Sequence, residues 1–216
     1  MIAACKNLGQ KVIWIGDQNQ MQPIVLLSEE TLTRNDFTML ANGFVTLCEN
    51  FDCKSYILTE THRLLNKSAA LTSLFYHTPL KSVADFDYLF ADSNLKYLPK
   101  DGGTTILYKD MPVGEKADKP SCDFAIRIVD EILALQPKLK IAVLTKFRAA
   151  VRMLQNSFIS QFGSKDNVLI DTVERVQGMT CDVCLYFIPN TMMGMSLNRQ
   201  LFNVATSRAK QLTIIV

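Results

Sequence analysis

The residues best suited to chemistry lie in the last quarter of the chain. Asp171 and Thr172 follow an apolar run, and Gln177-Gly178 comes shortly after them. Arg208 lies near the end of a helical segment, just before a final strand-like stretch. An arginine at such a position can stabilise the negative charge on a phosphoryl group during its transfer. These residue types therefore indicate phosphoryl chemistry.

The elements that would position these residues alternate between strand and helix. Residues 168–170 and 183–188 are apolar runs, a helix carrying Arg208 begins at 194–200, and residues 212–216 resemble another strand. This order is typical of a parallel α/β sheet, in which functional groups gather at the strand ends.

Two stretches of this region resemble motifs of superfamily 1 helicases. The stretch Asp171-Thr-Val-Glu-Arg-Val-Gln-Gly is similar to motif V, and Asn203-Val-Ala-Thr-Ser-Arg-Ala-Lys is similar to motif VI. The resemblance implies that Thr172 contacts the nucleic-acid backbone and that Arg208 acts as an arginine finger. It also implies that Gln177 and Gly178 help to form the ATP-facing surface. The alternative is a buried strand and a surface helix with an ordinary solvated arginine.

Earlier stretches resemble further motifs of the same superfamily. Gly-Asp17-x-x-Gln20-x-x-Pro follows the apolar run 11–16 and is similar to motif III, which implies that Asp17 and Gln20 face ATP and that Gln20 senses the γ-phosphate. An amide suits this role because it can donate to a phosphate oxygen and accept from water. The pair His62-Arg63 is similar to motif IV, which implies that Arg63 contacts the γ-phosphate and that the His62 ring stacks on adenine.

A possible nucleic-acid contact follows the strand-like residues 138–145. Thr145, Lys146 and Arg148 lie where this strand passes into a helix, and this turn is similar to a nucleic-acid-contacting turn of the family. The free N-terminus of a helix can bind a backbone phosphate, and the two cations would add positive charge. The alternative is a solvated helix face.

The remaining pattern predicts ordinary elements and loops. Asp130-Glu131 lies in a helical pattern, so it is not a Walker B pair, and residues 81–120 have loop character, with a mobile segment at 111–120 and no assigned chemistry. The other expected elements are a helix tail at 1–10, strands at 11–16, 44–47, 55–58 and 104–108, and helices at 31–42, 69–80 and 121–135, the last with Ser121 as its N-cap.

Composition narrows the class of protein. The chain has 216 residues, and its hydrophobic content of 48% is sufficient for a core. Its net charge of +2 is small, so any nucleic-acid site must be a local positive patch. No apolar run approaches the ~20 residues of a membrane helix, and no secretory leader is recognisable. The six cysteines are therefore expected to be reduced in the cytoplasm, with Cys181 and Cys184 as core thiols on opposite sides of a strand.

Two motifs of a complete helicase core are missing. The sequence holds no Gly-x-x-x-x-Gly-Lys-Ser/Thr phosphate loop, and no Walker B pair precedes Gly16. We therefore expect residues 1–50 to be the end of a first RecA-like domain with a connecting segment, and residues 51–216 to be the second RecA-like domain. This fragment alone should not hydrolyse ATP.

The resemblance as a whole implies a RecA-like α/β fold of the P-loop NTPase type, incomplete at both ends. It implies the C-terminal motor domain of an ATP-dependent helicase, most like the 5′→3′ branch, acting on single-stranded DNA or RNA. ATP and Mg²⁺ would be held mainly by the missing N-terminal domain; no metal-ligating set and no membrane partner are expected. One alternative is a non-catalytic helicase-derived module that binds nucleic acid or protein. Another P-loop enzyme, such as a nucleotide kinase, is disfavoured because its phosphate loop would have to lie inside the chain.

Overall fold

The computed structural model describes residues 13–22, 25–34, 43–44, 46, 54 and 56–216. The chain divides into two units, Met1–Leu58 and Thr59–Val216, which are treated separately below. In the first unit, α2 spans Glu29–Arg34. The helix tail predicted at 1–10 and much of the helix predicted at 31–42 lie outside the described residues.

Two strands predicted in the first unit are wrong where the structure describes them. Residues 13–16 form no strand, and Ile13 and Ile15 are 87% and 93% exposed. A strand is stable only beside a partner, and no described segment pairs with this one. In the run 44–47, Phe44 and Thr46 are helical, because a short apolar run does not by itself distinguish a strand from a helix.

The second unit is built on a five-stranded sheet in which every neighbouring pair of strands is parallel, in the order β3-β7-β6-β4-β5. Its strands are β3 (Gly103–Ile106), β4 (Ile141–Thr145), β5 (Val168–Thr172), β6 (Cys181–Phe187) and β7 (Ala209–Ile215). Two short strands, β1 (Glu60–Thr61) and β2 (Lys81–Ser82), form a separate parallel pair. The predicted α/β class with a parallel sheet is confirmed.

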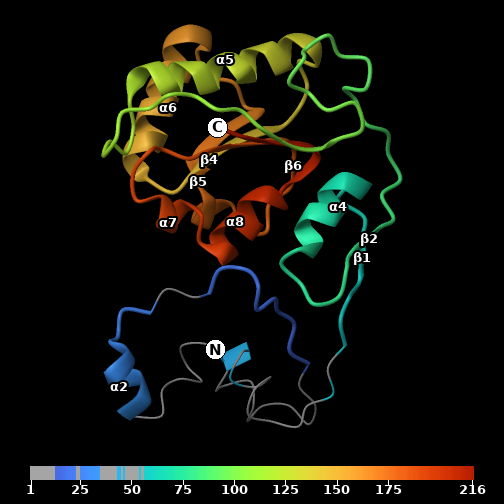
Figure 1. Ribbon diagram of the computed structural model, residues 1–216, viewed down its shortest axis with the longest axis vertical. Helices are drawn as coiled ribbons and strands as arrows, with labels where there is room; N and C mark the ends of the chain where they lie inside the picture. The colour runs from blue at the N-terminus through green and yellow to red at the C-terminus, as the bar shows by residue number, and fades with distance from the viewer. Residues whose placement is uncertain (1–12, 23–24, 35–42, 45, 47–53, 55) are drawn as a thin grey trace. The chain divides into compact units, whose positions relative to one another are not determined.

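Helices cover both faces of the sheet. α5 and α6 lie on one face and α7 and α8 on the other, with α4 beside the sheet (Figure 1). Because neither face is open to water, β6 is almost continuously buried, as is typical of parallel sheets. Within the described part of the chain, no helix is long and apolar enough to cross a membrane. The helical segments are α4 (Asn66–Ser73), α5 (Lys119–Leu135), α6 (Arg148–Phe162), the 3-10 helix η1 (Val173–Val176), α7 (Met193–Ser196) and α8 (Arg199–Thr206).

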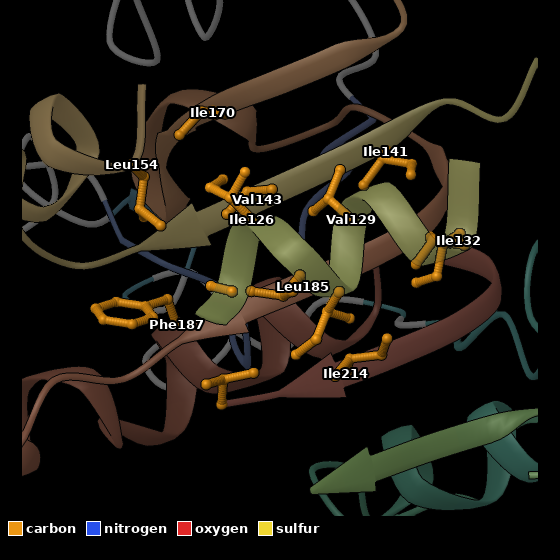
Figure 2. Close-up of a cluster of buried hydrophobic side chains, with 14 of the residues drawn as sticks. Ile126, Val129, Ile132, Ile141, Val143, Leu154, Ile170, Leu185, Phe187 and Ile214 are labelled. Carbon is orange, nitrogen blue, oxygen red and sulfur yellow. The ribbon is translucent and has the colours of Figure 1, made fainter. Parts of the chain in front are cut away.

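The hydrophobic core lies between α5, α6 and the sheet. Figure 2 shows Ile126 and Val129 of α5 close to Val143 of β4 and Leu185 of β6. Phe187, at the end of β6, is fully buried in the same cluster. The helical period of α5 brings its apolar side chains onto one face, so a single helix closes much of this layer.

Several other predicted elements need correction. The strand expected at 55–58, at the end of the first unit, is wrong, since residues 56–58 are exposed and form no strand. α4 ends at Ser73, well before residue 80. The N-cap of α5 is Asp118, whose carboxylate accepts from the backbone N–H of Ser121 at 3.0 Å. Asp118 acts as the N-cap because its side chain accepts from a backbone N–H that has no partner within the helix.

The irregular residues 83–102 are fixed to the sheet by side-chain contacts. The buried Gln211 of β7 accepts from the backbone N–H of Leu89 at 2.9 Å and donates to the carbonyl oxygen of Asp87 at 3.1 Å. The Tyr97 hydroxyl donates to Glu131 at 2.7 Å. Glu131 lies on α5, which confirms that Asp130-Glu131 is helical.

Candidate functional site

Arg208 lies at the edge of the sheet where β6 and β7 begin, called here the amino edge. The predicted last helix is in fact two helices, and Arg208 comes two residues after α8 rather than on it. Its guanidinium donates to the carbonyl oxygens of Val204 at 2.9 Å and Met179 at 3.4 Å, and to the Ser207 hydroxyl at 3.0 Å. These bonds fix the orientation of a side chain that is only 3% exposed.

Arg63 is brought to the same place from the other end of the unit. Its guanidinium donates to the carbonyl oxygen of Ser207 at 3.2 Å. Burial lowers the pKa of Arg208, and the nearby positive charge of Arg63 lowers it further. In the part of the chain that the structure describes, neither arginine forms an ion pair with a carboxylate. The amino edge therefore holds two neighbouring positive charges.

The turn between η1 and β6 completes the amino edge. Gln177 and Gly178 are exposed and lead directly to Met179, whose carbonyl oxygen accepts from Arg208. Gly178 has φ +87°, a left-handed conformation that favours glycine. His62 is exposed next to Arg63. The structure thus brings together five residues predicted from motifs IV, V and VI.

A pocket of about 230 Å³ opens at this edge, and Arg208, Met179, Cys181, Ile141 and Asn167 are among its lining residues. Arg208 thus borders this pocket, although it is almost fully buried. Sequence reasoning did not identify Ile141 or Asn167 as lining residues, because Ile141 begins β4, Asn167 precedes β5, and neither belongs to a motif.

The thiols of Cys181 and Cys184 lie beside Arg208 in the core. Both are buried and free, so the prediction of core thiols is confirmed. The prediction that they face opposite sides is wrong, because the pairing of β6 with β7 is irregular between Cys181 and Val183. A hydrogen bond with Cys181, together with burial, raises the pKa of the Cys184 thiol well above its ordinary value.

Asp17 and Gln20 form a turn of their own in the first unit. The Asp17 carboxylate accepts from the Gln20 side-chain amide at 2.8 Å and from the backbone N–H of Asn19 at 2.9 Å. Gly16 precedes this turn because a Cβ there would come within 3.0 Å of the Phe44 ring. Gln20 therefore belongs to an ordered turn of the first unit.

Thr145 and Thr172 lie at the opposite edge of the sheet, called here the carboxyl edge, where β4, β5 and β6 end. Thr145 is in register with Thr172 on one side and with Phe187 on the other. The Thr145 side chain is fully buried, and that of Thr172 is 7% exposed. The nucleic-acid contacts predicted for these hydroxyls stay predictions.

Replacing Thr145 with valine is expected to raise the free energy of unfolding of this chain by about 1 kcal/mol. The Thr145 hydroxyl is buried without a hydrogen-bond partner among the described residues, and an unsatisfied buried polar group costs free energy. Urea denaturation measures the change. The matched control is Thr213→Val, which should destabilise because the Thr213 hydroxyl donates to Thr206 at 3.2 Å. Equal destabilisation by both substitutions would show that the Thr145 hydroxyl has a partner.

The predicted cations of the carboxyl edge differ in their surroundings. The Lys146 ammonium forms an ion pair with Glu174 of η1, so its charge is largely compensated. Arg148, the first residue of α6, is exposed. Sequence reasoning missed Glu174 as the partner of Lys146, although its place within the motif V stretch put it just beyond the neighbouring strand.

Comparison with known proteins places the chain in a family. A family model described as an AAA domain matches residues 41–216. The chain therefore belongs to this AAA domain family, and its recognition as the C-terminal domain of a superfamily 1-type helicase is confirmed. No curated protein matches the chain.

Several helicases are among the solved structures to which the chain is similar. The helicase nsp10 of PRRSV is 17% identical at a TM-score of 0.35, with 72% of this chain and 23% of that chain covered. Arterivirus nonstructural protein 10 (helicase), in complex with DNA, is 16% identical at 0.41, with coverage of 93% and 32%. The Hef helicase domain of Pyrococcus furiosus is 17% identical at 0.32, with coverage of 45% and 26%. This chain spans about a quarter to a third of their lengths, and the assignment rests on the family model.

Proposed function

We propose that this chain is the C-terminal motor domain of an ATP-dependent helicase that moves along single-stranded DNA or RNA. The observation that carries the proposal is the buried Arg208, which has no carboxylate partner among the described residues and lies beside Arg63. A buried cation is costly unless an anion compensates it. The planar donors of two guanidinium groups suit the oxygens of a phosphate.

In this proposal Arg63 and Arg208 contact the γ-phosphate of ATP, together with Gln20 of the first unit. His62 stacks on adenine, and Gln177 and Gly178 contribute to the ATP-facing surface. A preceding RecA-like domain supplies the phosphate loop and holds Mg²⁺, which neutralises charge on the phosphates. The carboxyl edge contacts the nucleic-acid backbone.

The test is phosphate release by the longest native polypeptide that contains this sequence, measured with and without a single-stranded oligonucleotide. We expect hydrolysis of ATP that single strands stimulate. Salt-sensitive binding of the oligonucleotide without any hydrolysis would instead favour the non-catalytic nucleic-acid-binding module. If the polypeptide neither hydrolyses ATP nor binds the oligonucleotide, both functions are contradicted and a protein-binding role remains.

A further inference from the structure

The loop Met111–Lys116 lies at the carboxyl edge. The backbone N–H of Gly114 donates to the carbonyl oxygen of Asn190 at 3.1 Å, and the Asn190 side-chain amide donates to the carbonyl oxygen of Met111 at 3.2 Å. Asn190 follows the end of β6, so these two bonds attach the loop to this edge. Gly114 has φ +89°, which allows the chain to turn there.

This attachment brings Lys116 to the beginning of α6. Its ammonium lies 5.6 Å from the centre of the Phe147 ring, a cation–π contact. Phe147 immediately precedes α6 and is 8% exposed, whereas Lys116 is exposed. The ring therefore holds a solvent-facing positive charge two residues from Thr145.

Lys116 also differs from Lys146 in its charge balance. The Lys146 ammonium is paired with Glu174, while no carboxylate of the described residues forms an ion pair with Lys116. An aromatic ring orients a cation without neutralising it. Lys116 thus keeps a full charge for a ligand, and it comes from a segment to which the sequence assigned no chemistry.

We propose that Lys116 contacts a backbone phosphate of single-stranded nucleic acid bound at the carboxyl edge. The inference rests on the proposed function, since it takes the nucleic-acid side of that function as given. A phosphate is the fitting ligand because Lys116 and the exposed Arg148 face solvent near the same helix start, and backbone phosphates are the anions of a single strand.

The test measures binding of a fluorescent single-stranded oligonucleotide to the full chain over a series of salt concentrations. Each phosphate neutralised on a single strand contributes about 0.7 to the slope of log K against log salt. Lys116→Ala is expected to lower that slope by about 0.7 and to weaken binding about fivefold at about 0.1 M salt. The same loss is expected for oligonucleotides of different sequence, because a phosphate contact reads no base.

Lys165→Ala is the matched control. The Lys165 ammonium lies 5.2 Å from the centre of the Phe162 ring, so it makes the same kind of contact at the other end of α6. The Lys165→Ala substitution should leave both the salt slope and the affinity for the oligonucleotide unchanged. If the native chain binds but Lys116→Ala behaves like Lys165→Ala, the role of Lys116 is wrong and the proposed function stands. If the native chain fails to bind, the nucleic-acid part of the proposed function fails and Lys116 loses its role with it.

Discussion

Replacing Arg208 with alanine is expected to lower ATP turnover by about 10³- to 10⁵-fold, the loss seen when an arginine finger is removed from phosphoryl-transfer enzymes. The physical reason is that a guanidinium held by Val204, Met179 and Ser207 is already oriented before ATP arrives. Its charge then stabilises the transition state without further rearrangement. Steady-state phosphate release at saturating ATP, in the longest native polypeptide, measures the effect.

Controls must separate this role from folding, because Arg208 is almost fully buried. Arg208→Ala should still bind a single-stranded oligonucleotide with nearly native affinity, since the carboxyl edge is untouched. Arg127→Ala is the matched surface control, because Arg127 is exposed on α5, where its guanidinium lies over the Phe124 ring. Near-normal turnover in Arg208→Ala would show that the motif VI assignment is wrong.

The second large effect concerns stability. Phe187→Ala is expected to lower the free energy of unfolding by about 3–5 kcal/mol, because it removes a large buried ring and leaves a cavity in a core that cannot fully close. Phe187 is fully buried at the end of β6 and belongs to the main hydrophobic cluster. Urea denaturation of this chain, followed by far-UV circular dichroism, gives the value.

Tyr108→Ala provides the comparison for Phe187. Tyr108 is 86% exposed, and its hydroxyl donates a hydrogen bond to the nearby exposed Asp110 carboxylate at 2.9 Å. Its removal should change stability by no more than about 0.5 kcal/mol. A loss below about 1.5 kcal/mol for Phe187→Ala would mean that the core around β6 relaxes into the space.

The sheet of the second unit could be predicted from the sequence because its strands are buried on both faces. Such strands appear in the sequence as continuous apolar runs. The runs predicted at 183–188 and 212–216 correspond to β6 and β7 with shifted ends. The ends shifted because polar residues such as Asp182 of β6 and Lys210 of β7 can still lie within a strand. The same limit affected α5, where the apolar pattern reveals the helix but not which of two neighbouring side chains caps it.

Elements and contacts that depend on distant partners could not be predicted in the same way. Residues 13–16 have the composition of a strand, but composition does not supply a neighbour. The motifs named Arg63 and Arg208 one at a time, and only the fold shows that Arg63 reaches the residue next to Arg208. Lys116 had no local signal, because its position depends on the bonds between its loop and Asn190 and on its own contact with Phe147. The catalytic and binding roles of all these residues stay predictions.

The pairing of β3 with β7 determines how long β3 stays unpaired during synthesis of the chain. Gly103 is in register with Leu212, so about a hundred residues separate the two partners. A ribosome needs roughly 5–20 s to add that many residues. During this interval β3 has left the translation machinery without the neighbour that satisfies its backbone. The nascent chain therefore exposes β3 as an unpaired strand until β7 has been synthesised. We expect chaperones to matter most during this period.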